Sequence, residues 1–223
     1  GRIADADALR KEASSRSPVQ AKLEEATRLF IKGQFRESEK LAQELVRDNP
    51  HDVNPALLLA RLAMMASCYD DARTILEKIV DMQPRFMAAR HDLGTVLKEL
   101  HDYEGAVLVL EEAQRLDPDN ALTHYYLGAA LAMAARPEMA VRSYQQAVAL
   151  DPELPGAHIG LGHVLKTVGD QEGGVAAYRK AIALRPNFGE TYYSLANLKT
   201  FRFTEKDVET MTERLANDAL PVD

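Results

Sequence analysis

The sequence has no tryptophan and a single cysteine, and its aromatic residues make up 6% of 223 residues. The one cysteine, Cys68, cannot close a disulfide within the chain, so packing alone must hold the fold together. This usage is typical of proteins from a reducing compartment, and we expect a cytoplasmic location. Long apolar runs are also missing, because stretches such as residues 56–60 are far shorter than the roughly 20 residues of a membrane-spanning helix.

An excess of positive charge is missing too. The 27 Lys and Arg residues are outnumbered by 34 Asp and Glu residues, which gives a net charge of −7. Nonspecific binding to nucleic acid or to an anionic membrane needs a concentrated positive surface, so we expect neither as a partner. The apolar share of 46% and the charged share of 27% are those of a folded protein, and the abundance of Ala and Leu favours helices.

Prolines recur at a constant spacing of 34 residues without an insertion or a deletion. They are Pro50, Pro84, Pro118, Pro152 and Pro186. The spacing predicts five full repeats, at residues 19–52, 53–86, 87–120, 121–154 and 155–188, and then a sixth partial repeat at residues 189–203.

Equivalent positions of these repeats carry the same types of residue. The eighth position is small in all six: Ala26, Ala60, Gly94, Gly128, Gly162 and Ala196. The twentieth is small in all five full repeats: Ser38, Ala72, Ala106, Ala140 and Gly174. These offsets fit two amphipathic helices in each repeat, with small residues where two helix backbones approach closely. A turn is expected near the fifteenth position, where Gly33 and Gly169 stand.

The fourth repeat shows the pattern most fully, with Leu127-Gly128, Ala140, Tyr144, Ala147 and Leu150-Asp151-Pro152. It resembles the tetratricopeptide repeat, which has a period of 34 residues and this order of small and large positions. The resemblance covers residues 19–203. It implies an all-α fold, a right-handed α-solenoid (an alpha-alpha superhelix) of helix-turn-helix repeats whose first helices line the concave face. Each repeat then buries its apolar side only against its neighbours.

The two ends depart from the repeat. Residues 1–18 read as an N-terminal tail or a frayed helix, and residues 204–223 as a C-terminal capping helix. Thr204 is the expected N-cap of that helix and Asp207 its reciprocal partner. We expect its apolar residues Val208, Met211 and Leu215 to cover the fifth and sixth repeats.

A second resemblance concerns residues 185–203, with the string Ser-Leu-Ala-Asn-Leu-Lys at residues 194–199. This segment resembles the last repeat of bacterial sulfotransferases that contain tetratricopeptide repeats. In that family the repeats precede a catalytic domain that uses a phosphoadenylyl-sulfate donor. The resemblance places no catalytic residue in this chain, which lacks a glycine-rich phosphate loop after a predicted strand.

Side chains that could carry chemistry have plainer explanations. His124 and His158 occupy the fourth position of successive repeats, where a large packing residue is expected. No two histidines have the spacing that would direct both rings at one metal, and Cys68 has no second cysteine to assist it. We therefore expect no catalytic residue, no cofactor and no metal site, and we expect that this chain is not itself an enzyme.

The resemblance also implies a binding surface, since the second, fifth, ninth and twelfth positions of each repeat tend to face the groove. The residues chosen from these positions as the partner-binding groove are Asn54, Leu57, Arg61, Met64, His91, Thr95, Lys98, Tyr125, His163, Lys166, Tyr193 and Asn197. All such positions together hold three basic residues and one acid, against the net charge of −7 of the chain. This contrast predicts an acidic or C-terminal peptide segment as the ligand.

Two functions follow from these observations, with a third kept open. The first is a scaffold for protein–protein interaction that binds a peptide or partner segment in its groove, as part of a larger, bacterial protein. The alternative is the N-terminal, non-catalytic part of a sulfotransferase, which recruits substrate for a downstream domain. A homo-oligomer formed through the convex face or an exposed end is the third.

Overall fold

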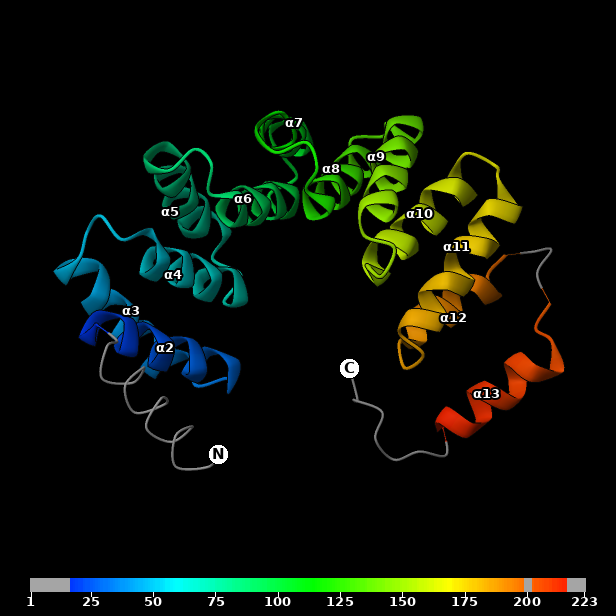
Figure 1. Ribbon diagram of the computed structural model, residues 1–223, viewed down its shortest axis with the longest axis horizontal. Helices are drawn as coiled ribbons and strands as arrows, with labels where there is room; N and C mark the ends of the chain where they lie inside the picture. The colour runs from blue at the N-terminus through cyan, green and yellow to red at the C-terminus, as the bar shows by residue number, and fades with distance from the viewer. Residues whose placement is uncertain (1–16, 199–201, 216–223) are drawn as a thin grey trace, which may run out of the picture. The chain divides into compact units, whose positions relative to one another are not determined.

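The structure is a computed structural model that describes residues 17–198 and 202–215, and the secondary structure of these residues is entirely helical (Figure 1). The expected all-α fold is thereby confirmed. Most of the N-terminal tail expected at residues 1–18, and residues 216–223 of the expected capping segment, lie outside the described residues.

The chain divides into two compact units, an N-terminal unit of residues 1–100 and a C-terminal unit of residues 101–223. The helices described in the N-terminal unit are α2 (Pro18–Ile31), α3 (Phe35–Asp48), α4 (Val53–Met65), α5 (Tyr69–Met82) and α6 (Met87–Glu99). Those described in the C-terminal unit are α7 (Tyr103–Leu116), α8 (Ala121–Met133), α9 (Pro137–Leu150), α10 (Pro155–Thr167), α11 (Gln171–Leu184), α12 (Gly189–Ala196) and α13 (Glu205–Leu215).

Within each unit, helices that follow one another in the chain pack together. In the N-terminal unit α2 contacts α3, α4 contacts both α3 and α5, and α5 contacts α6. The first helices of neighbouring repeats also touch, α2 with α4 and α4 with α6. The C-terminal unit repeats this arrangement from α7 to α12, with α8 beside α10. Each helix therefore buries its apolar face against its neighbours in the chain.

The first helix of each full repeat ends in the same way, with a left-handed residue at the fifteenth position. These residues are Gly33 (φ 73°), Ser67 (φ 58°), His101 (φ 60°), Ala135 (φ 56°) and Gly169 (φ 91°). The amide N–H of Ala135 donates to the carbonyl of Ala132, and that of Arg136 donates to the carbonyl of Leu131. These two bonds form a Schellman motif, which satisfies the last carbonyls of the helix and turns the chain toward the next one.

Three helices of the C-terminal unit begin on short polar side chains. Asp102 and Asp170 accept hydrogen bonds at 2.9 Å from the amides of Gly105 and Gly173, three residues further along. Asn120 does the same at 3.1 Å for Thr123 at the start of α8. Each bond satisfies one backbone donor that has no partner within its helix.

The small positions of the repeat lie where first and second helices approach most closely. The hydroxyl of Ser38, at the twentieth position, donates to the carbonyl of Ala26, at the eighth, over 2.8 Å. In the fifth repeat a Cβ atom added to Gly174 would lie 3.3 Å from the carbonyl oxygen of Gly162. This confirms the close backbone approach that the sequence pattern predicts.

In three repeats the side chain at the fourth position forms a hydrogen bond with a carbonyl of the turn that precedes the helix. His124 is 4% exposed, and its Nε2 donates to the carbonyl of Pro118 at 2.7 Å. His158 binds the carbonyl of Pro152 at 2.9 Å. Arg90 reaches the carbonyl of Pro84 at 2.7 Å through Nε. The expected packing role of the two histidines is therefore confirmed, and each also satisfies a carbonyl at the end of the preceding repeat.

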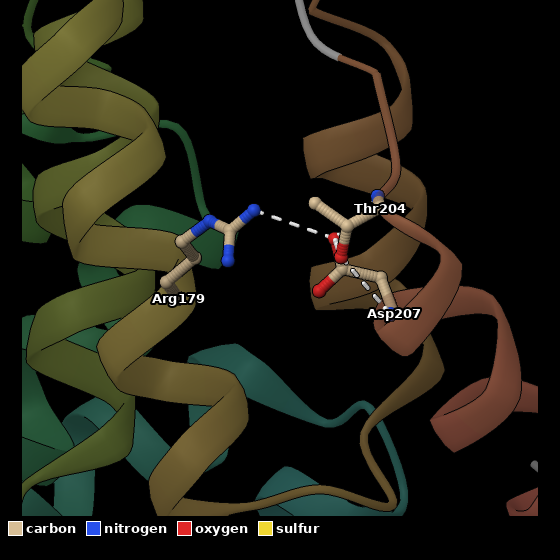
Figure 2. A network of polar contacts seen from close by, with 3 residues as sticks. All are labelled: Arg179, Thr204 and Asp207. Carbon is tan, nitrogen blue, oxygen red and sulfur yellow. Dashed lines mark hydrogen bonds and ion pairs between the residues drawn. The ribbon is translucent and has the colours of Figure 1, made fainter.

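Helix α13 begins with the expected capping box. The hydroxyl of Thr204 accepts from the amide of Asp207 at 3.2 Å, and the carboxylate of Asp207 accepts from the amide of Thr204 at 2.8 Å. Figure 2 shows that Arg179 of α11 also reaches this carboxylate, at 3.3 Å. Hydrogen bonds from Thr204 lower the pKa of Asp207, and burial opposes this shift. Val208, one of the residues that we expected to cover the fifth and sixth repeats, is 49% exposed, so about half of this residue faces solvent.

Candidate functional site

In the N-terminal unit the expected groove residues are divided between buried and exposed positions. Leu57 and His91 are buried, so they contribute mainly to packing between α4, α6 and their neighbours. Thr95 is half-buried, and its hydroxyl donates to the carbonyl of His91 at 3.0 Å within α6. Asn54 is exposed, and Met64 and Lys98 are half-buried. Burial lowers the pKa of Lys98, and the charge of Glu99 opposes this shift.

Arg61 does not offer a free positive charge to a ligand. Its Nε lies 2.7 Å from Oδ2 of Asp92, which projects from α6 and whose side chain is 15% exposed. Burial raises the pKa of Asp92, and the hydrogen bond and charge of Arg61 oppose this shift. The positive groove charge expected from the sequence therefore needs correction, because that count omitted Asp92 at the sixth position of its repeat.

In the C-terminal unit two of the expected groove residues, Tyr125 and His163, line one cavity of about 330 Å³. The other three expected residues of this unit do not line the cavity and lie on or just after α10 and α12. Lys166 is exposed near the end of α10, Tyr193 on α12 is 69% exposed, and Asn197 follows α12 as its C-cap. The structure thus brings together only part of the set that the resemblance implies for these repeats.

The cavity takes residues from three first helices, from α9 and from the turn that precedes α12. Its lining consists of Tyr125, Tyr144, Pro155, Gly156, Ile159, Gly160, His163, Arg185, Phe188 and Glu190. The volume is near the lower end of the range of about 300–1,000 Å³ typical of ligand pockets. A cavity of this size accommodates one large side chain of a partner.

Two glycines one helical turn apart on α10 let tyrosine rings of the cavity lining lie against the helix. A Cβ atom on Gly156 would lie 3.2 Å from the ring of Tyr125, and one on Gly160 would overlap the ring of Tyr144. Glycine inside a helix costs about 1 kcal/mol relative to alanine, so a pair of glycines on one face marks a close approach of other groups. This spacing is the sequence signal that could have located the cavity.

Aromatic rings form much of the lining. The rings of Tyr125 and Tyr144 lie 6.2 Å apart between centroids, and the ring of Tyr126 is 5.1 Å from that of Tyr125. At the turn before α12, the guanidinium of Arg185 lies 4.9 Å from the centre of the Phe188 ring. This cation–π contact keeps the charge of Arg185 beside an aromatic surface.

The charges around the cavity balance. Burial lowers the pKa of His163, while the charge of Glu190 raises it and that of Lys166 lowers it further. The imidazole is therefore neutral at pH 7, and its Nδ1 is hydrogen-bonded to the hydroxyl of Tyr178 at 2.9 Å. Arg185 and Glu190 contribute one charge of each sign to the lining. The cavity therefore has no net charge that would select an acidic or a basic ligand.

A larger hollow of about 610 Å³ lies in the N-terminal unit between α3, α4 and α5. Phe35 and Met65, which line it, are among the exposed large apolar residues, and Cys68 stands at its edge as the residue before α5. Its polar lining consists of surface side chains such as Arg36 and Glu39. Nothing in this hollow favours one ligand over another.

Neither a metal site nor a membrane span is found in the part of the chain that the structure describes. No group of three His, Cys, Asp or Glu side chains there is placed to hold a metal ion. None of the helices in residues 17–198 and 202–215 combines the length and the apolar composition that crossing a bilayer requires.

Sequence models of one repeat family match the chain over consecutive segments. A model described as TPR repeat matches residues 81–134, and three described as tetratricopeptide repeat match residues 29–97, 121–154 and 155–188. The chain contains tetratricopeptide repeats. No curated protein is similar enough in sequence to be matched with it.

Solved structures of tetratricopeptide-repeat proteins share this fold. TTC0263, a thermophilic TPR protein of Thermus thermophilus, has a TM-score of 0.69 at 20% identity over 87% of this chain and 99% of its own. MamA from Desulfovibrio magneticus RS-1 gives 0.63 at 24% identity over 76% and 96%. YrrB, described as a TPR protein with an unusual peptide-binding site, gives 0.58 at 16% identity over 85% and 96%. At these identities the likeness shows the fold alone.

Proposed function

We propose that this chain is a non-enzymatic module for protein–protein interaction, and that the first helices of its C-terminal unit bind an extended peptide or partner segment. One observation carries the proposal. The cavity between Tyr125, Gly156 and Glu190 lies on α8, α10 and α12, the first helices of three successive repeats. A peptide that runs across these helices could place one side chain in the cavity while its backbone lies along the adjacent surface.

The peptide-binding site for which YrrB is named supports a peptide as the class of ligand, but at 16% identity it carries no residue over to this chain. The proposal also revises the charge that we expect of the ligand. Lys166 is exposed near the end of α10, whereas Arg61 is balanced by Asp92. Acidic groups of the peptide are therefore expected to matter near Lys166 more than near Arg61.

The test is selection of displayed random peptides, about 12 residues long, against the purified chain, followed by fluorescence anisotropy with the selected peptides. Ile159→Arg places a long charged side chain in the cavity, and we expect it to weaken binding by about tenfold or more. Ala176→Arg, at an exposed position of α11, is the matched control and should leave affinity unchanged. A selection that yields no binding peptide, or equal affinities for the two variants, would contradict the proposal.

The second candidate function is the leading, non-catalytic part of a sulfotransferase that recruits its substrate. The observation that favours it is the string at residues 185–203, which includes Arg185, Phe188 and Glu190 of the cavity lining. Sequence beyond Asp223 decides between the two functions. A glycine-rich phosphate-binding loop after a strand would support the sulfotransferase, and a stop codon soon after Asp223 would exclude it.

A further inference from the structure

Two tyrosines at the same position of successive repeats differ in what their hydroxyls contact. Tyr144 and Tyr178 both occupy the twenty-fourth position, and both rings lie against the glycine at the eighth position of their own repeat. A Cβ atom on Gly128 would be 2.9 Å from the ring of Tyr144, and one on Gly162 would be 2.6 Å from that of Tyr178. The two rings therefore have comparable packing.

The residue at the ninth position decides whether the hydroxyl has a partner. In the fifth repeat this residue is His163, whose Nδ1 is 2.9 Å from the hydroxyl of Tyr178. In the fourth repeat it is Ala129, whose methyl group can neither donate nor accept. Tyr144 is 5% exposed, and none of the described residues forms a hydrogen bond with its hydroxyl. The hydroxyl oxygen itself is not fully buried, so it can bond a group supplied from outside through the cavity.

The free end of Tyr144 lies at the cavity. Tyr144 lines it, and its ring and hydroxyl lie against Gly160, which lines it too. The phenol stays protonated at neutral pH, because burial raises the pKa of Tyr144, so its hydroxyl can both donate and accept. The rest of the lining is largely aromatic or glycine, and its one cation and one anion cancel. These features suit an uncharged aromatic side chain with a polar tip.

We infer that the cavity binds a tyrosine side chain of the partner peptide, with the ring among Tyr125, Ile159 and Phe188 and the hydroxyl bonded to that of Tyr144. This inference rests on the proposed function and names the residue that the peptide must supply. Phenylalanine would fill the same space but leave the Tyr144 hydroxyl without a partner. A single neutral hydrogen bond corresponds to a preference for tyrosine of about fivefold.

The test uses three defined probes, N-acetyl-L-tyrosinamide, N-acetyl-L-phenylalaninamide and N-acetyl-L-leucinamide, titrated into the isotope-labelled chain and followed by NMR. We expect shifts at the amides of Gly156, Ile159 and Gly160, with tyrosinamide bound about fivefold more tightly than phenylalaninamide and leucinamide weakest. In Tyr144→Phe the ratio of the first two affinities should fall to about one. Gly156→Ala should weaken all three probes, because its methyl group would lie 3.2 Å from the ring of Tyr125 and displace this part of the cavity lining.

Tyr178→Phe is the matched control. It removes a hydroxyl that already has a partner in His163, so the preference for tyrosinamide should persist. Equal affinities of the unmodified chain for tyrosinamide and phenylalaninamide, a preference that survives in Tyr144→Phe, or no binding of any probe would overturn the inference. Selected peptides that are blocked by Ile159→Arg but show no need for tyrosine would overturn it while leaving the proposed function intact.

Discussion

One repeat of the N-terminal unit and two of the C-terminal unit fill the same pair of positions with different side chains. In the second repeat the eighth and twenty-fourth positions hold Ala60 with Leu76, whereas in the fourth and fifth repeats they hold Gly128 with Tyr144 and Gly162 with Tyr178. Exchanging alanine for glycine removes a methyl group and lets a ring lie against the helix backbone.

This exchange has consequences for the surface of the first helices. The branched side chain of Leu76 ends within the core of its repeat, whereas the longer side chain of Tyr144 reaches Gly160 of the next repeat and the cavity beside it. The sixth position of the repeats in the N-terminal unit is filled by Glu24, Leu58 and Asp92, where α10 has Gly160. The first helices of the N-terminal unit therefore carry an ion pair between Arg61 and Asp92, whereas those of the C-terminal unit border a cavity lined by aromatic rings.

The largest effect is expected from replacing Gly162 of the C-terminal unit by alanine, the residue that the second repeat has at the equivalent position, Ala60. In Gly162→Ala the new methyl group would lie 2.6 Å from the buried ring of Tyr178, and we expect a loss of about 2 kcal/mol in the free energy of unfolding. The double variant with Tyr178→Leu copies Ala60 and Leu76, and should recover about 1 kcal/mol. Urea unfolding followed by circular dichroism measures both, and an unchanged stability of Gly162→Ala would show that ring and backbone are not in tight contact.

A smaller effect is expected from the ion pair of the N-terminal unit. Arg61→Met leaves the carboxylate of Asp92 poorly solvated, and we expect a loss of about 1–2 kcal/mol at pH 7. The loss should shrink as the pH falls, because Asp92 can then be buried uncharged. Arg73→Met, which breaks exposed pairs with Asp70 and Glu77, should cost about 0.5 kcal/mol or less in the same unfolding experiment. Equal losses would mean that Asp92 is as well hydrated as the exposed acids.

The smallest effect concerns a feature that the two units share. Ala135 has a φ of 56°, where an L-residue is strained, so Ala135→Gly should stabilise the C-terminal unit by about 0.5–1 kcal/mol. Ser67→Gly should do the same for the N-terminal unit, in which Gly33 already uses glycine at this position. Ala134→Gly, one residue earlier at a φ of −76°, should instead be destabilising. Thermal unfolding that showed the same sign for Ala134→Gly and Ala135→Gly would contradict this.

The fold could be predicted almost entirely from the sequence, because the same pattern of small and apolar residues recurs in each repeat. The small residues at the eighth and twentieth positions, exemplified by Ala26 and Ser38, lie at helix contacts, and the capping box at Thr204 forms as expected. The residues of the candidate groove were harder to place. Leu57 and His91 proved to be buried, and Asp92 balances Arg61, since family positions describe an average repeat and not the side chains of neighbouring ones.

The sequence by itself determined the period, the helix pairs and the residues of each helix that face the core, since a helix places residues three and four apart on one side whatever surrounds it. Only the tertiary structure decided where space is left. The cavity depends on Tyr144 from α9, on glycines from α10 and on Phe188 from a turn, so its volume is what remains after side chains from several elements have packed. The cavity volume cannot be predicted from the sequence of any one element, because the packing that leaves it joins residues that are distant in the chain.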